Sequence, residues 1–296
     1  MFKNILKVLL LLAIGAISFA SYAGGPDQWS SDGRPGQTAR VPQDNEFKVC
    51  ADPNNMPYSN SNSEGFENKI AEVLADDLGR ELSFQFWPDR FGFIRNTIKA
   101  NRCDVIIGTN TTYDALNTTK PYYRAGHVWI YRKDSGYKID NWDSPDLRKG
   151  VIGIVDKSPV AQALNANNLM ANAKPYRLMR DLTKSPGQLV DHVVSGEIDV
   201  AIMWGPIGGY YAKQSKEDLV VVLIPEYSEG NEKLTGKTYW NISAGVRKKD
   251  DERRDMIEAA LIRNKDKIRK IMDDFGVPYT DPVFGDRLDG YKRHKN

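Results

Sequence analysis

Short hydrophobic runs alternate with amphipathic segments in the first half of the chain. Three runs, 47–51, 82–86 and 104–108, have the length and residue types of β-strands. The last of them, Asp-Val-Ile-Ile-Gly, is typical of a buried parallel strand. Segments 66–78 and 89–98 carry apolar side chains at helical spacing. This alternation of strand and helix predicts an α/β lobe.

The same alternation returns in the second half of the chain. Strand-like runs at 151–155, 176–179 and 199–204 lie between segments that begin with Ser-Pro, a common helix start. A short sequence is also repeated. Asn-Arg-Cys-Asp-Val at 101–105 and Gly-Glu-Ile-Asp-Val at 196–200 each lead from a predicted helix into a strand. One such unit in each half indicates two lobes of similar construction.

Two extended segments, 126–132 and 239–246, connect the two halves. The second leads into a long amphipathic helix predicted over 251–275, with Gly276 just past its end. If that helix packs on the first lobe, the chain crosses between the lobes twice, which is the design of a hinged binding protein. The predicted segments are lobe 1 (46–131 and 240–276), lobe 2 (132–239) and a C-terminal extension (277–296).

The first 23 residues have the pattern of a secretion signal. Lys3 and Lys7 precede an apolar run over 8–20, which is shorter than the ~20 residues that span a bilayer. A cleavage site follows at Ala23. We expect removal of this leader, a flexible lead-in over 24–45, and a periplasmic protein without membrane contact. An uncleaved anchor is the alternative.

Charge and motif content exclude several functional classes. Without Lys3 and Lys7, the basic residues only equal the 39 acidic ones, so no nucleic-acid partner is expected. The motifs of serine hydrolases, zinc proteases and nucleotide-binding proteins are missing. The three histidines, His127, His192 and His294, do not have metal-binding spacing. We therefore predict neither a metal nor a cofactor.

The two cysteines, Cys50 and Cys103, lie in predicted strands of the same lobe. Outside the cytoplasm they could form one disulfide. Two buried free thiols are the alternative, because the sequence does not give the distance between the two strands.

Polar residues follow the predicted strands at their carboxyl ends, the edge at which open α/β sheets bind ligands. Turn formation and helix capping are alternative roles for the same residue types. The candidate cleft residues are Asp52, Asn54, Asn55, Tyr58, Thr109, Asn110, Thr111, Thr112, Asp156, Lys157, Ser158 and Trp204.

The order of elements and the Thr…Pro-Tyr stretch of 109–122 resemble periplasmic solute-binding proteins of the amino-acid receptor type. The resemblance covers roughly 47–276 and implies a type II periplasmic binding protein fold, in which two hinge strands join two α/β lobes. In those receptors an arginine holds the ligand carboxylate and an aspartate holds the amino group. Here these positions are Thr112 and Trp204, so α-amino acid binding is not expected.

A narrower resemblance rests on segments 49–59, 64–71, 102–105 and 121–124, which include both cysteines and an Asp-Pro-Asn-Asn turn. These segments are similar to the solute-binding-like proteins associated with quinoprotein methanol dehydrogenase, the MxaJ/XoxJ group. The resemblance implies a periplasmic accessory protein of methanol oxidation, not an enzyme, that docks on the dehydrogenase or helps activate it.

Two other functions stay open. The chain could be a solute receptor of an ABC transporter that binds a small non-amino-acid ligand between its lobes. An enzyme on the same frame, as in periplasmic dehydratases, would need a proton-transfer group over a closed cleft. Asp52 and Asp156 are the first candidates for that group.

Overall fold

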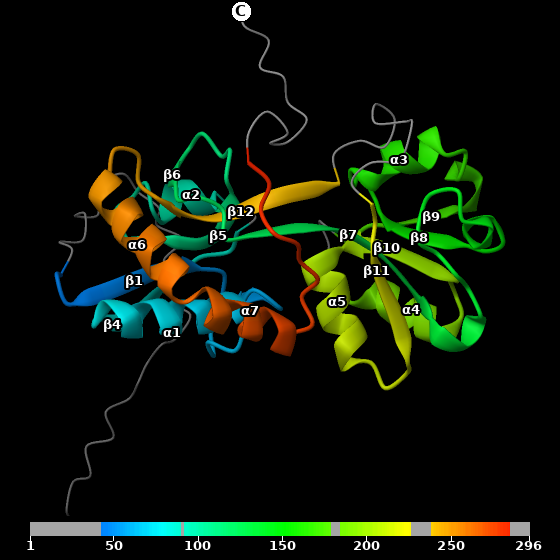
Figure 1. The fold of residues 1–296 in the computed structure, drawn as a ribbon, viewed down its shortest axis with the longest axis horizontal. Coiled ribbons are helices and arrows are strands. Elements are labelled where there is room, and N and C mark those ends of the chain that lie inside the picture. Colours follow the sequence, from blue (N-terminus) through cyan, green and yellow to red (C-terminus); the bar gives the residue numbers. More distant parts are fainter. Residues whose placement is uncertain (1–42, 90–91, 179–183, 226–237, 285–296) are drawn as a thin grey trace, which may run out of the picture. The chain divides into compact units, whose positions relative to one another are not determined.

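The computed structural model describes residues 43–89, 92–178, 184–225 and 238–284 (Figure 1), which belong to one compact unit, Arg34–Asn296. The predicted leader and nearly all of the predicted lead-in lie outside the described residues. No helix in the described ranges is long and apolar enough to cross a membrane. The secondary structure falls into two groups, called lobe 1 and lobe 2 below, and each group surrounds hydrophobic cores of its own.

Lobe 1 is built on parallel strands covered by helices. Its elements are β1 (Glu46–Ala51), β2 (Asn54–Asn55), β3 (Ser59–Asn60), α1 (Phe66–Leu78), β4 (Glu81–Phe86), α2 (Phe93–Asn96), β5 (Ile106–Asn110), β6 (Asn117–Thr118), α6 (Asp251–Arg263) and α7 (Lys265–Asp274). β1 pairs in parallel with β4, and Val49 pairs in parallel with Val105 beside β5. Phe66 and Ile70 of α1 share a buried cluster with Ile257 of α6, so helices distant in sequence close one core.

The C-terminal helical segment packs on lobe 1, and the prediction of one unbroken helix was wrong. α6 ends at Arg263 and α7 begins at Lys265, with Asn264 between them. The Asn264 side-chain amide donates to the Ala260 carbonyl oxygen at 3.0 Å and to a carboxylate oxygen of Asp77 at 2.8 Å. An asparagine that bonds to nearby backbone competes with continuous helix, which explains the break.

Lobe 2 is a strand layer with buried clusters on both faces. Its elements are η2 (Lys133–Ser135), η3 (Pro145–Arg148), β8 (Ile152–Val155), α3 (Val160–Ala166), η4 (Met170–Asn172), β9 (Ala173–Tyr176), α4 (Gln188–Ser195), β10 (Val200–Trp204), α5 (Gly205–Gln214) and β11 (Leu219–Leu223). Successive residues of one strand face opposite sides: Trp129 joins the cluster that includes α3, and Ile130 joins the cluster that includes α4. The strands are therefore apolar on both faces, as their continuous hydrophobic runs predicted.

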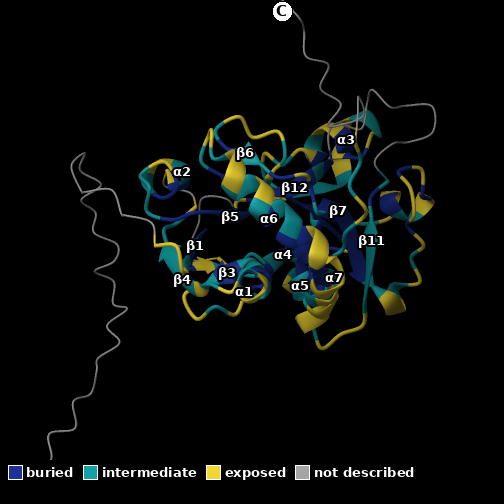
Figure 2. Ribbon diagram, turned by 60° about the vertical axis from the view of Figure 1, so that its left-hand side comes forward, coloured by how far each residue is buried: buried dark blue, intermediate teal, exposed yellow. Residues whose placement is uncertain are grey.

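Two strands connect the lobes. β7 (Tyr123–Arg132) is buried along nearly its whole length, and β12 (Tyr239–Val246) has the bounds that the sequence predicted (Figure 2). The first residues of β7 pair with β12, and the later ones pair with β10 and β11, so β7 belongs to both lobes. The resulting sheet has the order β5-β12-β7-β10-β8-β9. Because this sheet is continuous, strand ends of both lobes lie around one shared region. The lobe boundaries expected from the sequence stay a prediction.

Two predicted elements differ from the observed ones. Of the helix expected over 89–98, the described residues form only the short α2, and Gly92, with φ of 71°, precedes it in a left-handed conformation; residues 90 and 91 lie outside the described residues. The strand expected over 176–179 is β9, which ends at Tyr176. Residue 179 lies outside the described residues.

Candidate functional site

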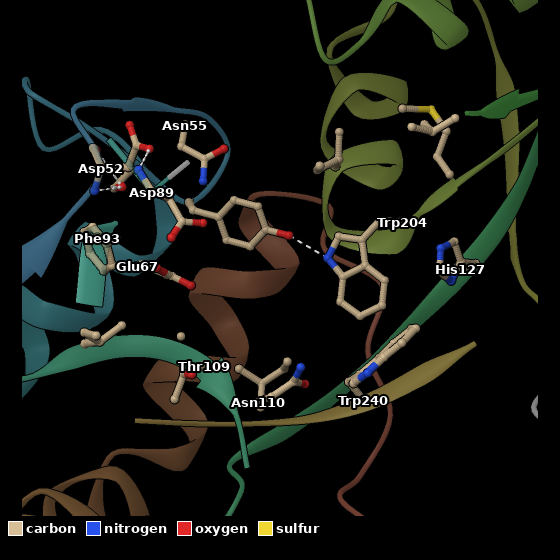
Figure 3. Close-up of a pocket in the computed structure, with 18 of the residues that line it drawn as sticks. Asp52, Asn55, Glu67, Asp89, Phe93, Thr109, Asn110, His127, Trp204 and Trp240 are labelled. Carbon is tan, nitrogen blue, oxygen red and sulfur yellow. Dashed lines mark hydrogen bonds between the residues drawn. The ribbon is translucent and has the colours of Figure 1, made fainter. Parts of the chain in front are cut away.

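A cavity of about 630 Å³ lies where strand ends of both lobes meet. Residues from β1, β5 and β12 form part of its lining, and the ends of β8 and β10 contribute another part from lobe 2 (Figure 3). Its volume falls within the range of small-molecule sites, and its position at strand ends is typical of ligand sites in α/β proteins. The cavity is therefore the candidate functional site.

Two thirds of the cleft residues expected from the sequence line this cavity. They are Asp52, Asn55, Tyr58, Thr109, Asn110, Lys157, Ser158 and Trp204. The other four are outside the lining that the structure describes. Asn54 and Thr112 are exposed, the Thr111 hydroxyl bonds to a β12 hydroxyl at 2.7 Å, and the Asp156 N–H donates to a β9 carbonyl at 2.8 Å. Ligand binding by any of these residues stays a prediction.

A hydrogen bond crosses the cavity from one lobe to the other. The indole Nε1 of Trp204, at the end of β10, donates to the hydroxyl of Tyr58, which precedes β3, at 2.6 Å (Figure 3). Gly205, which follows Trp204, approaches β7 so closely that a Cβ there would lie 2.5 Å from the Gly126 carbonyl oxygen. Burial and the nearby carboxyl of Glu67 raise the pKa of the Tyr58 hydroxyl well above its usual range, so it stays protonated.

Aromatic rings surround the lobe 2 side of this bond. His127 and Trp204 are directly paired on β7 and β10, with ring centroids 5.4 Å apart, and Trp240 lies 5.4 Å from Trp204 and 5.9 Å from His127. Burial lowers the pKa of His127 to about 4, and its Nδ1 lies 3.0 Å from the Thr238 carbonyl oxygen. These three rings are therefore uncharged at neutral pH, and Lys157 of lobe 2 lines the cavity beside them.

The lobe 1 side carries a carboxyl group that the sequence did not single out. Glu67 lies in the first turn of α1, and its carboxyl group rests against Gly108, where a Cβ would overlap it. Burial, with a smaller contribution from the charge of Asp89, raises the pKa of Glu67 to about 8. A glutamate early in a helix is ordinary in a sequence, and its contact with a glycine 41 positions later is visible only in the fold.

Asp52 has a different environment. Its carboxylate accepts the backbone N–H of Asn54 at 2.8 Å and that of Asp89 at 2.7 Å. One oxygen thus holds the turn at Asn54, and the other holds the segment that presents Asp89. Asp52 therefore shapes the cavity rim, and it is poorly placed to exchange a proton with a ligand.

The disulfide between Cys50 and Cys103 is confirmed, with the two Cα atoms 5.5 Å apart. Cys50 is in β1 and Cys103 immediately precedes Asp104 and Val105, whose carbonyl oxygen accepts the Cys50 N–H at 2.8 Å. The bond therefore joins two parallel strand segments beneath the cavity, which Cys50 also lines.

Comparison with known proteins identifies relatives of the whole described region. Residues 47–277 match the family model of bacterial extracellular solute-binding proteins, family 3. Protein MoxJ of Paracoccus denitrificans is 30% identical over an alignment of 243 residues, and the match covers 78% of this chain and 88% of MoxJ.

Two crystal structures have the same fold. MxaJ from Methlophaga aminisulfidivorans MPT is 30% identical with a TM-score of 0.70, and the match covers 79% of this chain and 100% of MxaJ. Periplasmic binding protein XoxJ from Methylobacterium extorquens AM1 is 31% identical with a TM-score of 0.65, and the match covers 80% of this chain and 100% of XoxJ. The expected fold class, two α/β lobes joined by two strands, is confirmed. The chain belongs to family 3 of the bacterial extracellular solute-binding proteins and is related to MoxJ, MxaJ and XoxJ.

Proposed function

We propose that the protein is a periplasmic accessory protein of methanol oxidation that docks on quinoprotein methanol dehydrogenase or helps activate it. Its relation to MoxJ, MxaJ and XoxJ over about four fifths of the chain supports this proposal. The predicted leader, which lies outside the described residues, would carry the chain to the periplasm.

The observation that carries the proposal is the hydrogen bond between Trp204 and Tyr58. Trp204 stands at the strand end where amino-acid receptors place an acidic anchor, and here the indole bonds to the opposite lobe. Thr112, at the position of the arginine anchor, is exposed and away from the cavity lining. Neither ionic contact that recognises an α-amino acid has a counterpart at these positions.

Contacts outside the cavity also link the lobes. Lys213 of α5 donates to the carbonyl oxygens of Asp273 and Asp274 at the end of α7, both at 2.9 Å. Tyr210 of α5 stacks on Phe275 with ring centroids 6.0 Å apart. A frame whose lobes are joined in this way presents a fixed surface, which suits docking on a partner better than closing around a solute.

The test is reconstitution with the methanol dehydrogenase of the same source organism. We expect this protein to co-migrate with the apo or holo dehydrogenase at micromolar concentration and to raise its dye-linked activity. A Trp204→Ala variant would retain this effect if docking uses the outer surface. The proposal fails if neither form of the dehydrogenase binds or responds.

A solute receptor is the second candidate, and the cavity volume is the observation that favours it. Ligand-dependent closure would lower the radius of gyration in X-ray scattering. The enzyme alternative has less support, because both Asp52 oxygens accept backbone N–H groups and Asp156 is outside the described lining.

A further inference from the structure

We propose that β11 is an interaction surface at which two copies of this chain pair edge to edge. The inference goes beyond the proposed function and does not depend on the dehydrogenase. β11 pairs with β7 and with no other strand in the described part of the chain. All five of its residues are half-buried, as its colour in Figure 2 shows. Within the described ranges, one edge of this strand therefore has no partner strand.

The backbone groups of every second residue of β11 point to this open edge. In an antiparallel ladder, successive residues direct their N–H and C=O groups alternately toward the partner strand and away from it. The carbonyl of Asp218, just before β11, accepts the Lys133 N–H at 2.9 Å, so the even-numbered residues face β7. The odd-numbered residues therefore direct their N–H and C=O groups outward, as a template for another strand. They are Leu219, Val221 and Leu223.

The sequence of β11 is the same in both directions, Leu-Val-Val-Val-Leu, with Val221 at its centre. Antiparallel pairing with a second copy around a two-fold axis at Val221 places this residue opposite itself and Leu219 opposite Leu223. These pairs join only outward-facing residues, so their N–H and C=O groups all find partners. Every β11 residue then has a β11 residue of the second copy opposite it, which makes the strand its own complement.

The other outer strand of lobe 2 has the features that prevent such pairing. β9 ends the described sheet on its opposite side and contains Lys174 and the exposed Pro175. Natural edge strands avoid pairing through charged residues and through proline, which has no N–H to donate. β11 has neither residue type. Pairing therefore uses β11 alone, and a two-fold pair of β11 strands closes at a dimer.

The charged residues near β11 do not oppose this pairing. In the two-fold register, Asp218 lies opposite Ile224 and Glu217 lies opposite Pro225 of the second copy. Neither acidic side chain therefore meets a like charge, which would destabilise directly opposed positions. Paired strands lie about 4.7–4.9 Å apart, so the leucine and valine side chains of the two copies would contact one another. A second copy thus fits this edge in register and in polarity.

Sedimentation velocity of the protein without its predicted leader, from about 1 to about 200 μM, tests the inference. We expect a reversible equilibrium between monomer and dimer with a Kd on the order of tens of micromolar. The affinity is modest because one pair of short strands buries less surface than a permanent dimer does.

Two substitutions at the same position provide the matched control. Val221→Pro removes the outward N–H at the two-fold axis, a group that makes no bond to β7, and we expect it to raise the dimer Kd at least tenfold. Val221→Thr keeps this N–H and the β-branched shape, and it should change the Kd less than about threefold. Unchanged far-UV circular dichroism of both variants would show that the fold is retained.

A pair of charged variants tests the two-fold register directly. Val221→Lys and Val221→Glu each place like charges opposite one another at the axis, so each variant alone should dimerise at least tenfold more weakly than the wild type. A mixture of the two variants should form a dimer again, because opposite charges then meet. This recovery requires that position 221 faces itself, and it remains a test if the proline variant does not fold.

Four outcomes would overturn the inference. The first three are a monomer at every concentration, a dimer that Val221→Pro leaves intact, and charged variants that fail to associate on mixing. The fourth is a wild type that stays monomeric alone and loses dehydrogenase binding on Val221→Pro, which would assign the β11 edge to the dehydrogenase. The accessory function is judged by the reconstitution assay, and a monomeric wild type would leave it standing.

Discussion

The two lobes begin one of their central strands with the same local structure. In lobe 1, Asn101 has φ of 54° and Asp104 follows three residues later; in lobe 2, Gly196 has φ of 75° and Asp199 follows at the same spacing. The Asp104 N–H donates to the Lys48 carbonyl at 2.7 Å, and the Lys48 N–H donates to the Asp104 carboxylate at 3.2 Å.

Asp199 makes the same two bonds with the start of the neighbouring strand. Its N–H donates to the Val151 carbonyl at 2.9 Å, and the Val151 N–H donates to its carboxylate at 2.7 Å. The repeated Asp-Val sequence thus marks a repeated hydrogen-bonded strand start, and this explains the internal similarity seen in the sequence.

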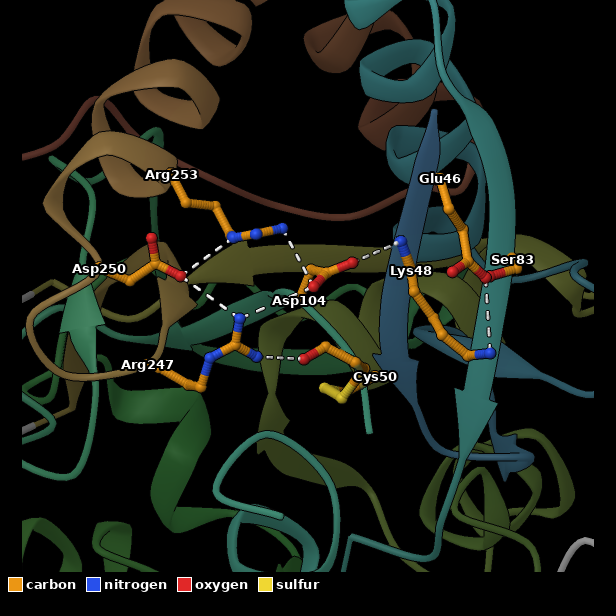
Figure 4. Close-up of polar contacts among 9 residues, drawn as sticks. Glu46, Lys48, Cys50, Ser83, Asp104, Arg247, Asp250 and Arg253 are labelled. Carbon is orange, nitrogen blue, oxygen red and sulfur yellow. Dashed lines mark hydrogen bonds and ion pairs between the residues drawn. A yellow bond between two sulfur atoms is a disulfide. The ribbon is translucent and has the colours of Figure 1, made fainter. Parts of the chain in front are cut away.

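The surroundings of the two aspartates differ. Asp104 is 1% exposed and pairs with Arg253 at 3.0 Å and Arg247 at 3.7 Å, and Asp250 holds both arginines (Figure 4). Asp199 is exposed and has no ion pair among the described residues. The same hydrogen-bonded strand start is therefore reinforced by a buried carboxylate with ion pairs in lobe 1. In lobe 2 no ion pair among the described residues reinforces it.

The largest expected effect is from Asp104→Asn. It leaves two arginines near a buried neutral amide, so we expect the free energy of unfolding to fall by ~3–5 kcal/mol. Asp199→Asn should cost less than ~1 kcal/mol, because an exposed carboxylate loses only a backbone contact. Urea unfolding followed by circular dichroism measures both, and similar losses for the two variants would refute the contrast.

A second prediction concerns the position before each aspartate, which is Cys103 in lobe 1 and the buried Ile198 in lobe 2. Replacing the disulfide with Cys50→Ala and Cys103→Ile should lower the free energy of unfolding by ~2–4 kcal/mol, because the disulfide closes a loop of 53 residues. The comparison is with the oxidised wild type, and the variant should not respond to reductant. Equal stability of variant and oxidised wild type would show that packing alone holds both strand starts.

The smallest effect is expected from exchanging the left-handed residues. Asn101→Gly should change the free energy of unfolding by less than ~1 kcal/mol, because both residue types accept this conformation. Asn101→Val should cost more, since a β-branched side chain is strained at φ of 54°. If the valine variant unfolds at the same urea concentration as the wild type, the left-handed conformation is not what this turn requires.

The sequence predicted the positions of strands and helices better than it predicted the contacts between residues far apart in the chain. The extended segment expected over 239–246 coincides with β12, and Gly276, with φ of 70°, marks the end of α7 as expected. The break at Asn264 was missed because one asparagine in a helical pattern is a weak signal, and its bond to Asp77 joins residues 187 positions apart.

The candidate site shows the same limit. Strand ends indicated the edge of the sheet at which the cavity lies, but turn residues there can point either way, and Thr112 and Asp156 lie outside the described lining. Glu67 and His127 gave no local signal, because their burial and altered pKa values arise from neighbours that only the fold brings together.

The passage between the lobes contains more than β7 and β12. Thr280, beyond α7, pairs with Arg124 of β7, and the Asn241 side chain of β12 accepts from Arg124 at 2.9 Å and donates to the Val283 carbonyl at 2.6 Å. Three segments thus run side by side at this point. Rotation of one lobe against the other would have to twist all three together, so we expect the C-terminal segment to add torsional stiffness to this connection.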